Sequence, residues 1–479
     1  MSKEISALKL KIKKSAQEIE TLDGQSRICN WLYNHLLEKA FELKALFKST
    51  QDREAAKKLY TARGLRNLLP AIKKEYPFLK VVHSSVLKNA ALRLSESIRM
   101  HQKSKKTQRK TGWPKYRAWK SHWFSLFYDE PTKGFFAQGD KLTLSLGMGE
   151  DRKQRSIELT LEESYLLKDK NIKNLRIVSE LGDYYAVFTI EQEAKKTKPL
   201  SKIIALDPNH KNFAYGVDLE GKALEIGALT WLKNYDKQID ELKAKRDKCQ
   251  KKAHKCPVLD TKGQPTDKFY YKPSQRWLKY QNSLEQSYRK RREQTKTFMF
   301  TAAHRLVAEY DCVGIGDYAP SGNGITPKMR RSMNNRSLIG KFKEVLSWVG
   351  KKSGKTIIIY DEKGTTRTCC HCHREVEGGL HPSIRQWECS GCKTQHIRDE
   401  NAAINGLDRI LSDLTENSGI IFPQVSCSDL VVKQRCAWRV STSGVIIKHR
   451  GVETARLSRN GKKLNRESDF SRPKVDQFV

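Results

Sequence analysis

Residues 361 to 407 read DEKGTTRTCCHCHREVEGGLHPSIRQWECSGCKTQHIRDENAAINGL. Two C-x2-C pairs, sixteen residues apart, contribute four cysteines: Cys369 and Cys372, then Cys389 and Cys392. This spacing is typical of a zinc ribbon, in which four thiolates complete the tetrahedral coordination of Zn2+ and leave no position open for chemistry. The pattern therefore predicts a structural zinc ion. Three further residues beside the first pair are interpreted as bystanders: Cys370, His371 and His373.

Two acids mark the ends of predicted elements around this ribbon. Asp399 opens the apolar helical segment that follows the second cysteine pair. Asp207 ends the continuously apolar run Ile203 to Leu206, which has the pattern of a strand buried on both faces. A lone Asp at a helix start is often only an N-cap. Together, however, the two positions make these acids candidates for one site.

The elements predicted from residue 196 onward are those of an α/β domain. Apolar strands are predicted over residues 203–206, 213–217, 223–226, 311–315 and 356–360. Strongly charged helices are predicted over 229–252 and 276–309, and a further helix over 338–351. With an acid ending the first strand and an acid opening the closing helix, this layout predicts an RNase-H-like nuclease domain.

Residues 1 to 195 have a different pattern, and the linker-like run AKKTKPLSK at residues 194–202 leads from them into the next domain. Helices are predicted from about Ser15 and over residues 84–100, with Ser84 or Ser85 as the N-cap of the second. Strand-like stretches at 141–146, 156–161, 172–179 and 184–191 predict a small antiparallel barrel or sheet. We therefore expect a separate N-terminal domain.

The composition favours a polyanionic partner. Lys and Arg number 91 and Asp and Glu 54, which gives a net charge of +37. A globular chain with this charge repels itself unless a polyanion neutralises it, and DNA, RNA or both are the expected polyanions. The alternative is a lysine-rich solvated surface. No run of 18 apolar residues occurs and the N-terminus lacks a signal-peptide core, so no membrane segment is expected. We expect an intracellular protein, cytoplasmic and nucleoid-associated in a prokaryote or nuclear in a eukaryote.

One segment interleaves cations with aromatic rings, as single-stranded or hybrid nucleic acid requires, because cations follow phosphates and rings stack on bases. The alternative is a solvated loop whose aromatic residues belong to the core. The candidate nucleic-acid-binding residues are Lys103, Lys105, Lys106, Arg109, Lys110, Trp113, Lys115, Tyr116, Arg117, Trp119 and Lys120.

Three sequence motifs carry a resemblance to the TnpB family of transposon-encoded, RNA-guided DNA endonucleases. ALDPNHKNFAYGVD resembles the first RuvC motif, and NNRSLIGKFKEVLSWVGKKSGK resembles the helix after the second. TTRTCCHC, WECSGC and HIRDENAAING resemble the zinc ribbon and third motif. Miniature type V CRISPR effectors and Fanzor proteins are relatives of this family. The resemblance implies a RuvC domain with an inserted zinc ribbon, preceded by a wedge-type β-barrel with a helical recognition insert.

This chain departs from the family pattern at the second motif. Most members end that strand with a catalytic Glu, whereas Gly316 stands here, followed by Asp317, which strand alternation would point away from the site. Glu362 follows the next strand, whose end lies beside that of its parallel neighbour. A Glu at this position resembles the rearranged site of Fanzor proteins and some prokaryotic relatives.

The resemblance implies Asp207, Glu362 and Asp399 as catalytic ligands of two Mg2+ or Mn2+ ions, which prefer oxygen ligands. It implies guide RNA and target double-stranded DNA as partners, with the protein reading a short flanking motif, as a monomer or as a dimer on one RNA. A nuclease-inactive RNA-guided binder and a zinc-ribbon transposon accessory protein without guide RNA remain alternatives. A transposon nuclease and a CRISPR effector are not distinguished.

The expected domain boundaries follow from these motifs. The barrel domain would span residues 1–195 with its helical insert at about 15–120, and the first part of RuvC would span 196–364. The zinc ribbon would span 365–397 and the closing RuvC helix 398–412. Residues 413–479 are predicted to be a basic, partly disordered extension, because Lys and Arg outnumber acids three to one from residue 431 onward.

Overall fold

The computed structural model describes residues 3–13, 15–106, 111–118, 124–149, 151, 153–193, 200–209, 212–259, 263–318, 326, 338–381, 383–418 and 430–450. The chain forms two compact units, residues 1–193 and 194–479. The boundary between them lies at the predicted linker.

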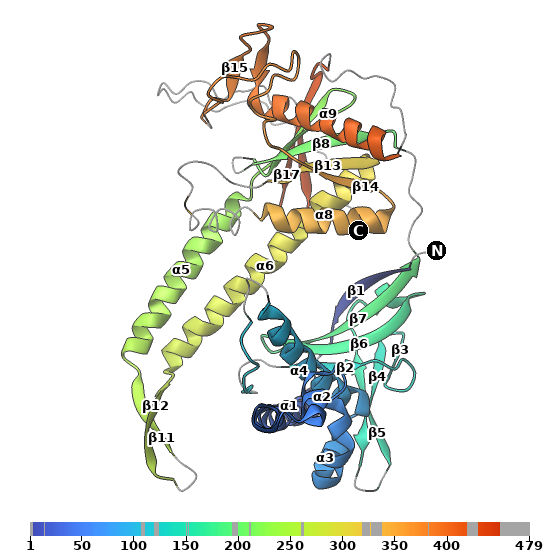
Figure 1. Cartoon of the computed structure of the whole chain (residues 1–479), viewed down its shortest axis with the longest axis vertical. Coiled ribbons are helices and arrows are strands. Elements are labelled where there is room, and N and C mark those ends of the chain that lie inside the picture. Colours follow the sequence, from blue (N-terminus) through green and yellow to red (C-terminus); the bar gives the residue numbers. More distant parts are fainter. Residues whose placement is uncertain are drawn as a thin grey trace. The chain divides into compact units, whose positions relative to one another are not determined.

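Two antiparallel sheets form the β part of the first unit (Figure 1). One has the order β1-β7-β6-β2, with β1 at Lys3–Lys11, β7 at Asp183–Glu193, β6 at Asn171–Glu180 and β2 at Leu126–Tyr128. The other has the order β3-β4-β5, at Phe135–Gln138, Lys141–Met148 and Gln154–Thr160. A bridge between Ile12 and Leu161 connects the two sheets. The strands lie where the alternation predicts them, as two sheets that meet at one edge.

The helices of the first unit are inserted between β1 and β2. They are α1 (Ala16–Thr50), α2 (Arg53–Tyr60), α3 (Leu69–Glu75) and α4 (Ser84–Ser104). Short 3-10 helices lie at Arg66–Leu68, Pro77–Val81 and Ser164–Leu167. Ser15 caps α1 as its position suggests, accepting from the backbone N–H of Glu18. The N-cap of α4 is His83 rather than either serine, because its Nδ1 accepts the Ser85 N–H.

A seven-stranded sheet forms the centre of the second unit, in the order β14-β13-β8-β9-β10-β17-β18. β8 (Ile203–Pro208), β13 (Cys312–Gly316) and β14 (Thr356–Tyr360) are parallel to one another. β9 (Ala214–Asp218) and β10 (Lys222–Ile226) follow as antiparallel neighbours. The predicted RNase-H-like strand pattern is therefore present as one sheet.

The side chains of β8 alternate between two hydrophobic cores, one on each face of the sheet, which explains why its run of residues 203–206 is continuously apolar. Ile204 and Leu206 enter the core beneath α6 (Gln275–Glu309) and α8 (Ile339–Ser353). Ile203 and Ala205 enter the core beneath α9 (Arg398–Ser418) on the opposite face. Asp207 continues the second series, so it lies on the face that α9 covers.

Asp311 ties the three parallel strands together where they begin. Its carboxylate lies 2.6 Å from the Lys355 ammonium, just before β14. The Ser201 hydroxyl, 2.7 Å away, and the Lys202 N–H, 3.1 Å away, donate to it from the residues before β8. This clamp fixes the stagger of the strands and therefore which residues meet at their other ends.

The two charged helices form an arm that leaves the sheet (Figure 1). α5 (Thr230–Lys251) and α6 pack side by side, and the Arg291 Nε lies 3.0 Å from the Asp236 carboxylate between them. A β-hairpin of β11 (His254–Leu259) and β12 (Pro265–Lys272) joins their far ends.

The expected boundary at residue 413 needs correction. α9 continues to Ser418, and β17 (Gln434–Val440) and β18 (Ile446–Arg450) are strands of the central sheet. β17 pairs in parallel with β10, and its Trp438 is 1% exposed in the core beneath α6. The sequence predicted an extension outside the fold because β17 contains few apolar residues and lies in a strongly basic region. Residues 451–479 lie outside the described residues.

The ribbon between β14 and α9 contains a small hairpin of β15 (Gln386–Glu388) and β16 (Gln395–Ile397). Its own core consists of Cys369, Cys389 and Trp387. β16 leads directly into α9, so no loop separates the ribbon from the helix that carries Asp399. Within the described ranges, no helix combines the length and the apolar character needed to cross a bilayer.

Candidate functional site

Three acids are positioned at one edge of the central sheet. Asp207 lies at the end of β8, Glu362 lies two residues beyond β14, and Asp399 lies in the first turn of α9. Asp207 and Asp399 are buried, and Glu362 is half-buried. β13 lies between β8 and β14, and the carboxyl ends of these three parallel strands deliver side chains to one edge of the sheet, where α9 begins.

The space beside Gly316 is occupied by the Glu362 side chain. A Cβ on Gly316 would lie 2.5 Å from the Glu362 Oε2 and 3.1 Å from the Pro208 Cδ. Cys312 lies in the core beneath α9, and Gly316, four residues further along β13, shares that face. The Glu362 carboxylate therefore lies where a side chain from position 316 would begin.

Asp317 has a different role from the three acids. Its carboxylate accepts a hydrogen bond from the Glu362 N–H at 3.3 Å, and its own N–H donates to the Tyr360 carbonyl at 2.9 Å. It thus fixes the backbone that carries Glu362.

Burial and neighbouring charges raise the pKa of two of these acids, Asp207 and Glu362. Burial, followed by the charges of Glu362 and Asp399, raises the pKa of Asp207 well above its ordinary value. Burial, followed by the charge of Asp317, raises the pKa of Glu362 to about 7. The Glu362 Oε2 is buried and lacks a hydrogen-bond partner among the described residues. Like charges with an unsatisfied carboxylate oxygen fit a divalent cation, which would lower both pKa values.

The side chains as they stand do not form a closed ligand cage. Among the described residues, the four cysteines form the one group of three or more His, Cys, Asp or Glu side chains that is arranged to hold a metal ion as it stands. The Asp399 Oδ1 lies 3.1 Å from the Arg385 Nη1, which comes from the ribbon. Binding of a cation at Asp399 would therefore compete with this ion pair.

Three polar residues of α9 form hydrogen bonds with the segment that carries Glu362. Asn401 and Asn405 both donate through Nδ2 to the carbonyls of Thr365 and Thr368, at 2.8 to 3.1 Å. Arg409, one helical turn further, donates to the carbonyls on both sides of Glu362. These positioning residues were not predicted. Their i, i+4, i+8 spacing on an apolar helix was the signal that could have identified them.

The C-terminal strand β17 holds the start of α9. The buried Glu400 accepts from the Arg435 Nε at 2.7 Å and Nη2 at 3.0 Å, and from the Tyr215 hydroxyl at 2.8 Å. A bidentate Arg–carboxylate pair is geometrically specific. Because Glu400 follows Asp399, this network orients the first turn of α9 at the site.

The four predicted zinc ligands converge. Their sulfur atoms all lie within 4.8 Å of one another, with Cys369 and Cys392 3.6 Å apart and Cys372 and Cys389 3.5 Å apart. Hydrogen bonds with the hydroxyl and backbone N–H of Thr394 lower the pKa of Cys392 to about 6, which favours the metal-binding thiolate. The cluster can therefore hold a metal ion.

Two of the predicted bystanders lie beside the cluster in defined places. Cys370 belongs to the core beneath α9, and its N–H donates to the Asn401 Oδ1 at 2.9 Å. The His371 N–H lies 3.4 Å from the Cys369 sulfur. A residue that sequence reasoning passed over, His396, has its Nε2 3.1 Å from the same sulfur. Such outer contacts orient metal ligands.

The predicted nucleic-acid segment is partly docked on α1. Arg117 stacks over Tyr33 at 3.7 Å, and its N–H donates to the Asn34 Oδ1. Trp113 is half-buried, with the Lys44 ammonium 3.9 Å from its ring. The exposed members are Lys103, Lys105, Lys106, Lys115 and Tyr116. Arg109, Lys110, Trp119 and Lys120 lie outside the described residues.

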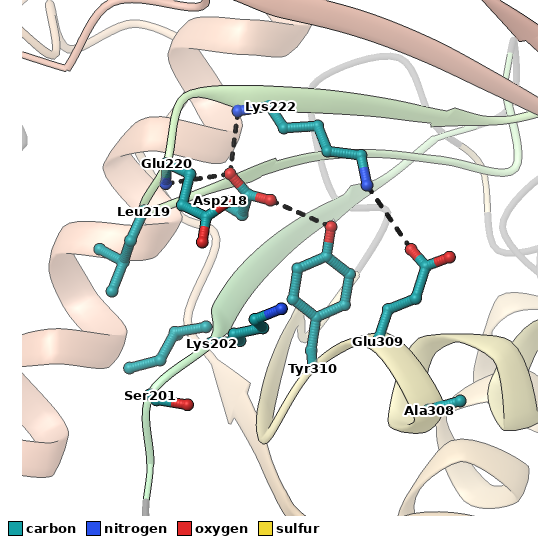
Figure 2. Close-up of a pocket in the computed structure, with 10 residues that line it drawn as sticks. Ser201, Lys202, Asp218, Leu219, Glu220, Lys222, Ala308, Glu309 and Tyr310 are labelled. Atoms are coloured by element: carbon teal, nitrogen blue, oxygen red, sulfur yellow. Dashed lines mark hydrogen bonds and ion pairs between the residues drawn. The ribbon is translucent and has the colours of Figure 1, made fainter.

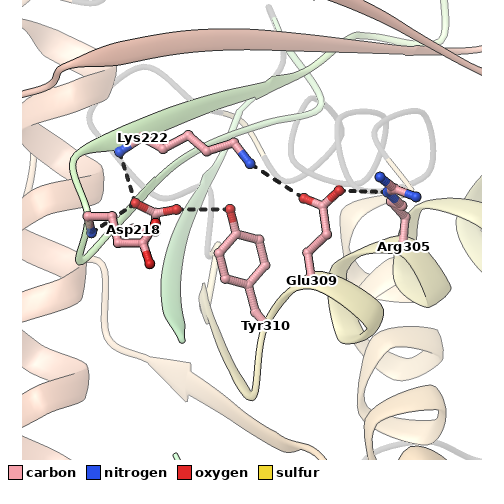
Figure 3. A network of polar contacts seen from close by, with 6 residues as sticks. Asp218, Lys222, Arg305, Glu309 and Tyr310 are labelled. Atoms are coloured by element: carbon pink, nitrogen blue, oxygen red, sulfur yellow. Dashed lines mark hydrogen bonds and ion pairs between the residues drawn. The ribbon is translucent and has the colours of Figure 1, made fainter. Parts of the chain in front are cut away.

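A polar pocket lies at the opposite end of β8 from Asp207 (Figure 2). Asp218 accepts from the N–H groups of Glu220 and Lys222, and its Oδ2 accepts from the Tyr310 hydroxyl at 3.1 Å. Glu309 is paired with Lys222 and with Arg305 (Figure 3). The acids of this pocket are engaged in holding the turn after β9 to the end of α6, which is a structural role.

Comparisons with known proteins agree with the motifs. A family model described as "Cas12f1-like, TNB domain" matches residues 340–406. The chain is 26% identical over 138 residues to the TnpB-like proteins L79 and R854 of Acanthamoeba polyphaga mimivirus, over 28% of its own length. The matches cover 26% of L79 and 25% of R854, so the chain spans about a quarter of each relative.

Solved structures give a weaker likeness. A Cas12f1-sgRNA-target DNA complex matches with 12% identity and a TM-score of 0.44, over 84% of this chain and 98% of that one. On sequence, residues 340–406 of this chain are therefore similar to a Cas12f1-like TNB domain, and 28% of the chain is similar to the viral TnpB-like proteins.

Proposed function

We propose that this chain is an RNA-guided DNA endonuclease with a rearranged RuvC site. The observation that carries the proposal is the Glu362 carboxylate in the space beside Gly316, at the edge of the sheet that also carries Asp207. A nuclease that had lost its second-motif Glu would have no physical reason to keep a buried, unsatisfied carboxylate there. The cost of burying it unpaired is about 1–3 kcal/mol or more.

Asp207, Glu362 and Asp399 are the residues that would hold a pair of Mg2+ or Mn2+ ions. When bound, these ions activate a water and stabilise the leaving oxygen of a phosphodiester. Arg385, which pairs with Asp399 here, would then be released toward the phosphates of the substrate. Asn401, Asn405 and Arg409 keep Glu362 against the sheet during this exchange.

Zinc at Cys369, Cys372, Cys389 and Cys392 would be structural. Four thiolates leave no open coordination position, and β16 connects the ribbon directly to Asp399. Zinc binding would therefore stabilise the geometry of the catalytic edge without taking part in the reaction.

The guide RNA and the DNA target are proposed from the TnpB resemblance and from the charge. A net charge of +37 favours a polyanionic partner, and a TnpB-like protein would use base pairing of its RNA to read the target. In this reading the exposed lysines of residues 103–115 contact the nucleic-acid backbone. Trp113 and Arg117 are half-buried, so in this proposal they hold the segment in place and do not contact the nucleic acid.

The experiment that tests the site compares two amide substitutions on a DNA target matched to the co-purified RNA. Glu362→Gln should abolish Mg2+-dependent cleavage while guided binding persists, because the amide cannot supply a charged ligand. Asp317→Asn is the matched control, since it keeps the acceptor for the Glu362 N–H and should retain most activity. Cleavage that survives Glu362→Gln would exclude the rearranged site, and binding without cleavage in the unmodified protein would favour an inactive RNA-guided binder.

A further inference from the structure

The hairpin formed by β11 and β12, which we call the tip hairpin, lies at the end of a long arm. α5 has 22 residues, so the arm extends about 33 Å from the sheet. In the described part of the second unit, none of the three core clusters includes a residue of the tip hairpin. A two-stranded hairpin is only marginally stable alone in water. The tip hairpin nevertheless exposes apolar side chains, and a binding partner would account for them.

Three consecutive aromatic residues are exposed on β12. Phe269, Tyr270 and Tyr271 are 48%, 54% and 47% exposed. Strand alternation places Phe269 and Tyr271 on one face, with ring centroids 5.7 Å apart, and Tyr270 on the other. Lys255, which pairs with Tyr271 across the hairpin, has its ammonium 3.5 Å from the Phe269 ring centroid. Rings and a cation thus share one accessible face.

The charge around these rings selects the partner. Residues 245–280 contain eleven Lys or Arg and three Asp, a net charge of +8. The exposed cations include Lys251, Lys252, Lys255 and Lys272. A second copy of this chain would be repelled, because it carries the same positive charge. Duplex DNA is read through hydrogen bonds to base edges, for which flat rings are poor partners.

We infer that the tip hairpin binds RNA, by stacking unpaired bases on Phe269, Tyr270 and Tyr271 while the neighbouring lysines contact the phosphates. Base stacking on aromatic rings and cationic contacts to the backbone are how unpaired nucleic acid is bound. The tyrosine hydroxyls add groups that can hydrogen-bond to a ribose 2′-hydroxyl, the feature that distinguishes RNA from DNA. This surface belongs to the second unit and the exposed lysines of residues 103–115 belong to the first, and the inference does not depend on cleavage by the carboxylate site.

The test measures binding of the full chain to poly(U), to poly(dT) and to duplex RNA, at raised salt so that purely ionic binding is weak. The variant combines Phe269→Ala, Tyr270→Ala and Tyr271→Ala, and the control is Tyr165→Ala, which removes a ring that is 70% exposed in the first unit. Affinity for poly(U) should fall about 5- to 150-fold for each base whose stacking is lost. Affinity for poly(dT) should fall less, and affinity for duplex RNA should stay close to wild type.

Three outcomes would overturn the inference. One is a triple variant that binds poly(U) as the Tyr165→Ala control does. Another is an equal loss for poly(dT), which would assign the rings to single strands of either sugar. The third is unchanged RNA binding with a changed oligomeric state, which would assign them to a second copy. Ultraviolet crosslinking of poly(U) to the unmodified protein should label residues 269–271, so a folding defect in the variant cannot hide the answer. A cleavage-deficient Glu362→Gln protein should bind poly(U) normally, which separates this inference from the nuclease proposal.

Discussion

Gly316→Ala should disable cleavage while leaving the fold intact. The new Cβ would lie 2.5 Å from the Glu362 Oε2, whereas ordinary contact begins at 3.4 Å, so the carboxylate must move by about 0.9 Å. A displacement of about 1 Å at a reacting centre costs roughly 100-fold in rate. The folding cost is small because the end of a flexible side chain moves. An off-rotamer shift is worth about 0.5–1.5 kcal/mol.

The assay is single-turnover cleavage of a DNA target matched to the co-purified RNA, with thermal unfolding measured in parallel. Gly340→Ala is the matched control, because a Cβ there meets nothing within 4 Å and the residue is exposed on α8. A second variant, Gly316→Glu with Glu362→Ala, returns a carboxylate to the second-motif strand and should recover part of the lost rate. Equal cleavage by Gly316→Ala and Gly340→Ala would refute the reasoning, because Glu362 would then not need the space it occupies.

Other predictions follow from the same structure. Cys389→Ala should leave the chain without zinc, against one ion per unmodified chain, and elemental analysis that finds equal zinc would contradict the ribbon assignment. Trp438→Ala should lower the free energy of unfolding in denaturant by about 3–5 kcal/mol, since it removes a buried core ring; a loss below about 1 kcal/mol would mean that β17 does not belong to the core. Burial of Asp311 opposes its ionisation, but hydrogen bonds from Lys355 and from the residues before β8 outweigh it and hold the pKa of the carboxyl below its ordinary value. The stabilisation by Asp311 is therefore present above about pH 4 and is lost as the pH falls further. The difference in unfolding free energy between wild type and Asp311→Asn should shrink on acidification. A difference that grows would contradict the lowered pKa of Asp311.

Some of the site could be predicted from the sequence because it depends on local spacing. The four cysteines could be assigned to one cluster because a C-x2-C turn brings two sulfur atoms together whatever surrounds it. Asp207 could be placed because a strand buried on both faces is continuously apolar, and the first polar residue marks its end. Glu362 required one further step, namely that parallel neighbours present their ends at the same edge.

The rest depended on contacts between residues distant in the chain. The pairing of β17 with β10 joins Gln434 to Lys222, and its short apolar run among many cations gave no sign of it. The sequence suggested that Trp113 and Arg117 project to nucleic acid, whereas α1 supplies the partners that partly bury them. Local periodicity follows from the geometry of the backbone and can be read from a few residues. Pairing across two hundred residues is decided by which surfaces fit together, and only the tertiary structure contains that information.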